Sequence, residues 1–352
     1  MKTTYKSIGL MSGTSVDGLD VCCATFTKDG GKWSFKIDCA RGYDYPAELK
    51  EKLGRKVQDM SALEFVTFHS QYGFFLGERV NDFMKEFGVR PDIIASHGST
   101  VFHEPAKKVM YQIGDGAAIA AVTKVPTVSD FRRLDIMLGG QGAPLVPIGD
   151  ELLFGDYDYC LNIGGFDNIS FRQGDKRIAF DISPVNYVIN KYCREIGLEF
   201  DRDGVIASKG TVNEQLKAKL DALDYYGKTY PKSLGREWVE QNVFPLLDGC
   251  GLSMEDKLCT YYEHCAHQFA RVTEPGKTVL VTGGGAYNKF LISRMEALSG
   301  CKIIIPESAT IEFKEALIFA FLGVLYMAGE PSCLASVTGA ERDNIGGMLF
   351  KI

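Results

Sequence analysis

Paired cysteines of the C-x-x-C type are absent from this sequence, although it contains ten cysteines. Scattered cysteines are typical of reduced, buried residues in a cytosolic protein and do not predict a disulfide framework. The five histidines also lack a cysteine partner at metal-binding spacing, which argues against a zinc site. His264 and His267 lie three positions apart, a spacing more typical of a packing or surface pair on a helix.

Long apolar runs are missing as well: none approaches the roughly 20 residues that a membrane span needs. The N-terminus leads into a strand-like pattern without the apolar core of a signal peptide. Basic clusters are short, as at Lys107-Lys108 and Arg132-Arg133, and the formal net charge is −6. Because this charge repels polyanions, we expect no binding to nucleic acid. From the scattered cysteines and the missing apolar runs we expect a cytoplasmic protein that does not bind a membrane.

The phosphate-binding motif G-x-x-x-x-G-K-[ST] and the dinucleotide motif G-x-G-x-x-G do not occur in this sequence. Glycine-bearing turns are present instead. Residues 5–26 predict a β-hairpin whose turn carries Gly13 and Gly18, and residues 158–171 repeat the design with Gly164 and Gly165. In residues 278–286 a buried type of strand ends in three glycines, and helical spacing follows over 287–298.

A phosphate chain needs backbone N–H groups, hydroxyls and a metal ion around it, and a glycine-bearing turn lets it lie close to the backbone. The turn over residues 13–18 (GTSVDG) offers turn glycines, two hydroxyls and Asp17, which can bind Mg²⁺ directly or through water. Taken alone, it could be a plain hairpin turn. Together with the turns at 162–168 and 282–286 it favours a nucleotide site, and ATP in particular.

With 352 residues the chain exceeds the roughly 250 to 300 residues of a single core, so two domains with a cleft between them are expected. Helical periodicity covers 61–87, 205–223 and 312–328, while 92–96, 125–128 and 302–305 predict short buried strands. The Gly- and Pro-rich segment 130–147 is the candidate hinge. We expect one domain from residues 1–133 plus about 330–352, and a second from 134–329.

Asp181 ends a predicted strand directly before a turn with Pro184, where a carboxylate is well placed to act as a base. The alternative is that Asp181 caps a helix that begins near Pro184.

The chain resembles the anhydro-N-acetylmuramic acid kinase family from end to end. The motifs that carry the resemblance are residues 11–20 (MSGTSVDGLD), 96–105 (SHGSTVFHEP), 129–132 (SDFR), 139–147 (GGQGAPLVP), 161–165 (LNIGG), 231–237 (PKSLGRE), 283–288 (GGGAYN) and 314–316 (KEA).

The resemblance implies an α/β, two-domain, actin-like (ribonuclease H-like) ATPase fold, use of ATP and Mg²⁺, a homodimer and a role in recycling cell-wall sugars. Family enzymes open the internal 1,6-anhydro ether with water while the γ-phosphoryl group moves to O6, giving N-acetylmuramic acid 6-phosphate. On that pattern Asp181 deprotonates the attacking water. His97, Arg132 and Glu315 belong to the sugar site, with Arg132 suited to the lactyl carboxylate because its planar fork binds both oxygens.

The predicted ATP-binding residues come from the three turns: Gly13, Thr14, Ser15, Val16, Asp17, Gly18, Asn162, Gly164, Gly165, Gly283, Gly284, Gly285 and Asn288. For Arg132 the alternative is a buried structural ion pair with Asp130 or Asp135.

Three places depart from the family pattern. Residues 182–185 (ISPV) stand where Thr-Gly-Pro-Gly is usual, Ser99 replaces a glutamine, and Phe166-Asp167 replaces small residues. We expect the residues at 182–185 to hinder backbone approach to a ligand and the extra carboxylate of Asp167 to repel phosphate unless it binds metal. A kinase of the same fold acting on another sugar, or a nucleotide-binding protein without catalysis, are the alternatives to the family's reaction.

Overall fold

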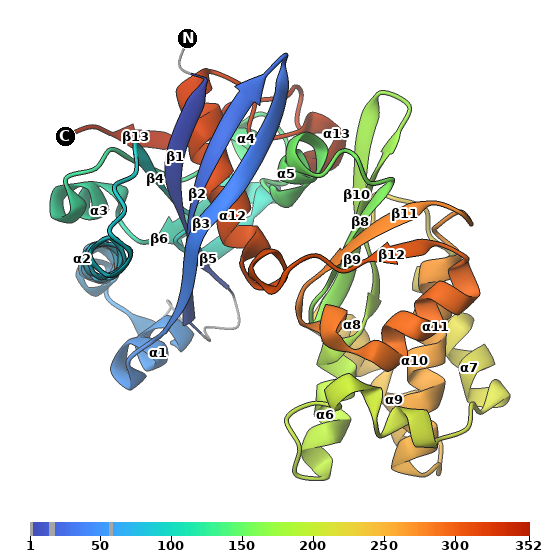
Figure 1. Cartoon of the computed structure of the whole chain (residues 1–352). Coiled ribbons are helices and arrows are strands. Elements are labelled where there is room, and N and C mark those ends of the chain that lie inside the picture. The colour runs from blue at the N-terminus through green and yellow to red at the C-terminus, as the bar shows by residue number, and fades with distance from the viewer. Residues whose placement is uncertain (1–2, 14–17, 56–58) are drawn as a thin grey trace. The chain divides into compact units, whose positions relative to one another are not determined.

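Residues 3–13, 18–55 and 59–352 are described by the computed structural model (Figure 1). Contacts between Cα atoms divide the chain into a first unit, Met1–Leu153 with Phe313–Ile352, and a second unit, Phe154–Glu312. The second unit is thus one continuous segment, inserted between two parts of the first.

The first boundary of this division, 153/154, falls later along the chain than the expected 133/134, and the second, 312/313, falls earlier than the expected limit near 330. The candidate hinge 130–147 groups with the first unit. Its buried Asp135 accepts hydrogen bonds from Thr338 Oγ1 and Asn344 Nδ2, both at 2.9 Å, which tie the segment to the C-terminal part. Residues 313–329 also group with the first unit, because α12 (Ser308–Ala328) packs against its sheet at Gly9.

The first unit contains a six-stranded sheet with the order β13-β7-β4-β1-β2-β3 and a two-stranded sheet of β5 and β6. Its strands are β1 (Thr4–Ser12), β2 (Gly18–Asp29), β3 (Lys32–Asp44), β4 (Ile93–Ser96), β5 (Ser99–Glu104), β6 (Val109–Ile113), β7 (Thr127–Ser129) and β13 (Met348–Phe350). Its helices are α1 (Ala47–Gly54), α2 (Ala62–Phe87), η2 (Pro105–Lys107), α3 (Gly116–Thr123), α4 (Arg133–Met137), α5 (Val146–Leu153), α13 (Ala335–Thr338) and most of α12 (Ser308–Ala328).

Alternation along β1 sends its side chains to two different helical layers. Ile8 and Leu10 belong to a core that includes Leu76 of α2, whereas a Cβ on Gly9 would lie 1.9 Å from the carbonyl oxygen of Ala316 in α12. Because successive residues of a strand point to opposite faces, α2 and α12 cover opposite faces of this sheet. The long α2 begins at a capping box of Ser61 and Glu64.

The second unit contains a five-stranded sheet with the order β10-β9-β8-β11-β12. Its strands are β8 (Tyr159–Ile163), β9 (Phe166–Gln173), β10 (Lys176–Pro184), β11 (Thr278–Thr282) and β12 (Lys302–Ile304). Its helices are α6 (Asn186–Glu195), η3 (Arg202–Gly204), η4 (Ala207–Lys209), α7 (Glu214–Asp221), η5 (Asp224–Gly227), α8 (Arg236–Asn242), α9 (Phe244–Asp248), α10 (Met254–Ala270), η6 (Gly284–Tyr287) and α11 (Lys289–Ser299).

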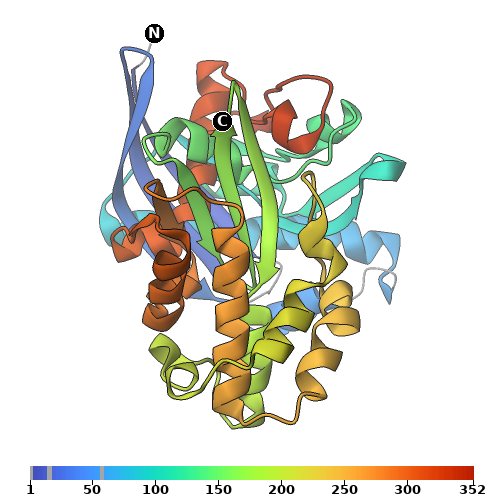
Figure 2. The same cartoon turned by 90° about the vertical axis from the view of Figure 1, so that its right-hand side faces the viewer.

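The helices of this unit gather beside one face of its sheet, as Figures 1 and 2 show. Leu161 of β8 and Val281 of β11 share a hydrophobic core with Tyr261 of α10, Leu291 of α11 and Ile189 of α6. Every second residue of β8 and β11 enters this core, so the strand period fixes which face is covered.

The two larger sheets repeat one topology. In each, an antiparallel meander of three strands (β1-β2-β3 or β8-β9-β10) continues from its first strand into two parallel strands, β4-β7 or β11-β12. This duplicated α/β arrangement confirms the expected actin-like, ribonuclease H-like fold class.

Most predicted elements are confirmed, including both hairpins, the strand over 278–282 and the helix α2. The helical prediction for 205–223 is correct only in part, because a short 3₁₀ turn precedes α7 there. All ten cysteines are free thiols. Within the described ranges, no helix combines the length and the apolar character needed to cross a membrane.

Candidate active site

The first glycine-bearing turn joins β1 to β2 in the first unit. Thr14, Ser15, Val16 and Asp17 lie outside the described residues, so their assignment to ATP and Mg²⁺ stays a prediction. The ends of the turn are anchored. Ser12 Oγ lies 2.7 Å from the Tyr72 hydroxyl, and a Cβ on Gly18 would lie 2.7 Å from the carbonyl oxygen of Tyr43. Position 18 therefore requires glycine.

The second and third glycine-bearing turns lie against each other in the second unit. Asn162 at the end of β8 pairs with Thr282 at the end of β11. Gly283 has φ 79°, and a Cβ there would come within 2.8 Å of Asn162 Oδ1 and 2.7 Å of the Ile163 carbonyl oxygen. The structure thus brings together two turns that are 120 residues apart in the sequence.

The glycines of these two turns differ in what surrounds them. A Cβ on Gly285 would meet Ile163 Cγ2 at 2.1 Å, so this glycine serves packing, whereas a Cβ on Gly284 would meet nothing within 4 Å. The carbonyls of Gly164 and Gly165 accept hydrogen bonds from Asn186 N and Val185 N at 3.2 and 2.9 Å. The space beside the Cα atom of Gly284 is therefore open.

Asn288, another predicted ATP residue, has a clear structural role. It is the N-cap of α11, where its Oδ1 accepts a hydrogen bond from Leu291 N at 3.0 Å. Its Nδ2 donates to the Tyr262 hydroxyl at 2.7 Å. Because both polar ends of the side chain are engaged, a contact of Asn288 with ATP stays a prediction.

Asp181 lies near the end of β10, where a register shift separates it from Ser183. Its Oδ2 accepts a hydrogen bond from the backbone N–H of Leu234 at 2.9 Å, and its carbonyl oxygen accepts one from the Tyr225 hydroxyl at 2.6 Å. Burial raises the pKa of the Asp181 carboxyl, and the Leu234 N–H opposes part of that rise. A carboxylate held in this way is a stronger base than a solvated aspartate.

The helix-capping alternative for Asp181 is wrong. Helix α6 begins at Asn186, its N-cap is Val185, and no side chain caps it. The carboxylate of Asp181 is instead directed to the loop that contains Leu234.

Two of the residues that depart from the family pattern bind each other. Asp167 is fully buried, and its Oδ1 accepts hydrogen bonds from Ser183 N at 2.5 Å and Ser183 Oγ at 3.0 Å. Burial raises the pKa of Asp167 to about 7, against the effect of the two bonds from Ser183. The carboxyl of Asp167 therefore points into the unit and binds Ser183, and its expected repulsion of phosphate stays a prediction.

The other departures at this place are also internal. Ile182 and Val185 are buried members of the core of the second unit, and Phe166 stacks on Tyr187 with ring centroids 5.7 Å apart. The expected hindrance of backbone approach to a ligand over residues 182–185 stays a prediction. These replacements thus lie in the packing beneath the turn.

In the first unit, His97 and Arg132 form one hydrogen-bonded group. His97 Nδ1 lies 2.8 Å from the Gly98 carbonyl oxygen, which can only accept, so Nδ1 carries the proton and Nε2 is an acceptor. Arg132 Nη2 and Nε donate to that Nε2 at 2.9 and 3.3 Å, and Gln112 Nε2 lies 2.9 Å from it. Burial, followed by the charge of Arg132, lowers the pKa of His97 to about 3. His97 is thus a neutral acceptor that orients Arg132.

The alternative ion pairs of Arg132 are absent from the described residues. Asp130 pairs with Arg133 at 2.8 Å, and Asp135 accepts from Gly142 N and from the side chains of Cys333, Thr338 and Asn344. The remaining partner of Arg132 is the Gly142 carbonyl oxygen, 2.8 Å from Nη1. Burial lowers the pKa of Arg132 to about 10, opposed mainly by Glu315.

Glu315 lies in α12, beside Lys314, whose ammonium forms a buried ion pair with Asp150 at 2.7 Å. Desolvation raises the pKa of the Glu315 carboxyl, and the positive charges of Arg132 and Lys314 oppose this rise. Arg132 and Glu315, 183 residues apart in the sequence, are thus close enough to interact electrostatically, as their joint assignment to one site requires.

Sequence reasoning missed the groups that hold these side chains in place. Tyr225, Gln112 and the Gly142 carbonyl contact Asp181, His97 and Arg132 respectively. The sequence did contain a signal for Gly142 and for Leu234, whose N–H binds Asp181, because both lie in motifs that carry the family resemblance. Nothing in the sequence pattern pointed to Tyr225 or Gln112.

A family model described as anhydro-N-acetylmuramic acid kinase matches residues 5–351 of this chain. The anhydro-N-acetylmuramic acid kinase of Shewanella loihica is 35% identical over 368 residues, which cover 97% of this chain and 98% of the relative. The enzyme of the same name from Vibrio vulnificus is 33% identical, with 99% of each chain covered.

Matches among solved structures are remote. Component A of (R)-2-hydroxyglutaryl-CoA dehydratase from Acidaminococcus fermentans has a TM-score of 0.47 at 11% identity, over 92% of this chain and 99% of that chain. The activator of 2-hydroxyisocaproyl-CoA dehydratase from Clostridium difficile, solved with bound ADPNP, has a TM-score of 0.41 at 11% identity, over 92% and 94%. The family assignment rests on the family model and the curated relatives alone. On that basis, this chain belongs to the anhydro-N-acetylmuramic acid kinase family of ATP-dependent sugar kinases.

Proposed function

We propose that this chain converts 1,6-anhydro-N-acetylmuramic acid, ATP and water into N-acetylmuramic acid 6-phosphate and ADP. The observation that carries the proposal is Asp181, whose carboxylate has a raised pKa and is held by one N–H bond to Oδ2. Among the described residues, no hydrogen bond engages its Oδ1, which leaves that oxygen to take a proton.

Asp181 acts as the general base. It accepts a proton from the water whose oxygen forms a bond to the anomeric carbon of the sugar. The bond from that carbon to O6 breaks, and its electron pair stays on O6. This oxygen then forms a bond to the γ-phosphorus, and ADP leaves with the electron pair of the broken phosphoanhydride bond.

The glycine-bearing turns supply the ATP phosphates with backbone donors. A Cβ on Gly284 would meet nothing within 4 Å, so a phosphate oxygen can approach the main chain there. Gly283 has φ 79°, a backbone conformation that favours glycine. These features fit a nucleotide phosphate. The residues of the first turn, 13–18, complete this assignment.

Mg²⁺ supplies charge neutralisation at the phosphates during phosphoryl transfer. It commonly binds through one or two carboxylates together with substrate phosphates and water, so a dedicated cluster of protein ligands is not needed. Asp17 is the residue we assign to it, directly or through water.

Arg132 is suited to the lactyl carboxylate of the sugar. Of its five N–H groups, three are directed to His97 and the Gly142 carbonyl oxygen. One N–H on each terminal nitrogen remains, which matches the two oxygens of a carboxylate. His97 acts through Arg132, and Glu315 accepts hydrogen bonds from sugar hydroxyls.

The decisive test is the Asp181→Asn variant. We expect phosphorylation of the anhydro sugar to fall by about 10²- to 10⁴-fold, because the base is lost, while calorimetry shows unchanged ATP binding. Wild-type turnover of ordinary amino sugars in place of the anhydro sugar would favour the alternative of a kinase with another substrate. Unaltered activity of Asp181→Asn would refute the proposed base.

The cellular setting belongs to the same proposal. We assign the chain to the cytoplasm, where it acts in the recycling of cell-wall sugars. We also propose that it forms a homodimer. Light scattering after gel filtration would measure the mass of that dimer.

A further inference from the structure

The second unit has a pocket of about 240 Å³ beside β10. Phe180 and Ile182 of β10 form one wall, and Asp181 lies between them in the strand, where alternation directs its side chain to the opposite face. The loop after η5 contributes Lys228 and Lys232, and the C-terminal end of α10 contributes Arg271. Asp181 itself is not among the residues that line this pocket.

Three cationic side chains meet at this pocket with little to neutralise them. Lys228 lies 3.5 Å from Asp224, an exposed partner. Lys232 Nζ lies over the ring of Tyr225 at 4.6 Å from its centroid, and Arg271 Nη1 donates to Gln268 Oε1 at 3.2 Å. In the described part of the chain, neither Lys232 nor Arg271 has an ion pair with a carboxylate. Burial, and then the charges of Arg271 and Lys228, lower the pKa of Lys232.

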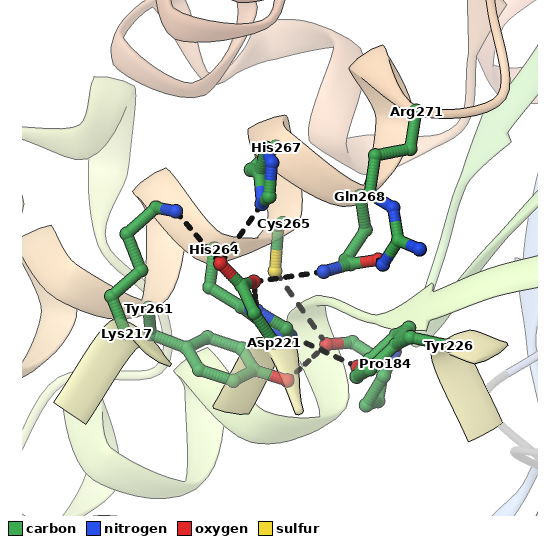
Figure 3. A network of polar contacts seen from close by, with 10 residues as sticks. All are labelled: Pro184, Lys217, Asp221, Tyr226, Tyr261, His264, Cys265, His267, Gln268 and Arg271. Carbon is green, nitrogen blue, oxygen red and sulfur yellow. Dashed lines mark hydrogen bonds and ion pairs between the residues drawn. The ribbon is translucent and has the colours of Figure 1, made fainter. Parts of the chain in front are cut away.

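The wall behind these charges is fixed by a network around Asp221 (Figure 3). Gln268, only 3% exposed, donates from Nε2 to Asp221 Oδ1 at 2.8 Å and presents Oε1 to Arg271. His264 Nδ1 donates to the same carboxylate at 2.6 Å, so its Nε2 accepts from the hydroxyl of Tyr226, a further pocket residue, at 3.0 Å. The pocket is thus preorganised, because two of its lining side chains are held from behind.

The chemistry of this network does not suit a metal ion. His264 and His267 both direct Nδ1 to Asp221, and Lys217 also binds that carboxylate, at 2.7 Å. No group of three His, Cys, Asp or Glu able to hold a metal occurs within residues 3–13, 18–55 and 59–352. The charge of Asp221 is satisfied by these donors, whereas Lys232 and Arg271 have no carboxylate partner among the described residues.

We propose that the pocket binds a small oxyanion, a phosphate or carboxylate group, through Lys228, Lys232 and Arg271. Its volume has room for a phosphate and several further atoms, since a water molecule occupies about 30 Å³ in the liquid. Arginine and lysine beside apolar ring faces form charge-assisted hydrogen bonds to such groups. The inference does not depend on the proposed reaction.

Crystals of the full chain soaked in sodium tungstate test the location directly, because the anomalous signal of tungsten identifies the bound tetrahedral oxyanion. We expect a peak within hydrogen-bond distance of Lys232 Nζ and the Arg271 guanidinium. Tungstate found only at other places in the chain would overturn the proposal.

Calorimetric titration with inorganic phosphate, at saturating ADP to occupy the nucleotide site, tests binding in solution. The double variant Lys232→Gln, Arg271→Gln should bind phosphate at least tenfold more weakly than wild type. Lys209→Gln, Lys219→Gln is the matched control, since it removes the same charge from exposed positions of the same unit. Equal phosphate affinity in all three proteins would overturn the proposal.

A parallel titration with acetate identifies which class of oxyanion the pocket prefers. Phosphate binding without acetate binding assigns the pocket to a phosphate group, and comparable binding of both assigns it to oxyanions in general. Single variants Lys232→Gln and Arg271→Gln, each checked for a cooperative thermal transition, replace the double variant if that protein does not fold.

Discussion

At the scale of residues, a hydrogen-bonded contact explains why Asp167 and Ser183 occur together in this chain. Each replaces a smaller residue of the family pattern, and the Asp167 carboxyl accepts two hydrogen bonds from Ser183. Sequence reasoning placed the charge of Asp167 near phosphate because residue type alone does not reveal which way a side chain at a turn points. The pairing depends on the register of β9 and β10, which is set across the sheet.

The raised pKa of Asp167 makes a prediction about stability. Between the unfolded value, near 3.8, and the folded value of about 7, the folded chain keeps a proton that the unfolded chain has released. Stability from this group is therefore fully present below the lower value and is lost as pH rises to about 7. The Asp167→Asn variant cannot ionise at this position, so its stability should not show this decrease as the pH rises.

Urea unfolding of both proteins at pH 5, 6, 7 and 8 measures the effect. The difference in free energy of unfolding, Asp167→Asn minus wild type, should grow by up to about 1.4 kcal/mol per pH unit below pH 7 and then level off. Groups common to both proteins cancel in the difference. A difference that stays constant from pH 5 to pH 7 would contradict the assigned pKa.

At the scale of elements, the crossing of β1 and α12 brings backbone closer to a glycine than at any other glycine whose surroundings the structure describes. A Cβ on Gly9 would lie 1.9 Å from the Ala316 carbonyl oxygen and 2.5 Å from Ala320 N. Both are backbone atoms of a helix, so they cannot yield as a flexible side chain could. The sequence shows an unremarkable strand glycine here, because its partner lies 307 residues away.

We expect Gly9→Ala to lower the free energy of unfolding by about 3 kcal/mol or more. This is the upper end of the usual cost of overpacking, because the added methyl group would meet backbone atoms. Gly54→Ala is the control, since its Cβ would meet nothing within 4 Å at the end of α1. Urea midpoints of the two variants and wild type measure the effect. Similar midpoints for Gly9→Ala and Gly54→Ala would show that α12 shifts at little cost.

At the scale of the whole molecule, local patterns correctly predicted both hairpins, several buried strands and the helices α2, α11 and α12, but they gave no prediction for elements such as β3 or α10. They did not predict where the chain passes from one unit to the other. The segment 130–147 has the composition of a linker, yet Asp135 binds it to Thr338 and Asn344. Contacts between residues 200 positions apart leave no trace in a single sequence, so composition misplaces such a boundary.

The division into units predicts how fragments behave. Residues 154–312 contain a complete five-stranded sheet and its helical layer, so this segment expressed alone should fold with a cooperative thermal transition. Residues 1–153 lack α12 and β13 and should remain incompletely folded alone, because one face of their sheet is uncovered. Circular dichroism melting curves of both fragments test this. Cooperative melting of 1–153 alone would contradict it.

The insertion of one unit within the other also sets an order of events during translation. The ribosome delivers all of residues 154–312 before it delivers the part of α12 that covers Gly9. Domains often fold in the order of their synthesis, N-terminal first. Here the unit that starts second can be finished first, and the nascent first unit must wait, with one sheet face bare, until the final 40 residues emerge. During that interval the first unit is the part of the chain most in need of a chaperone.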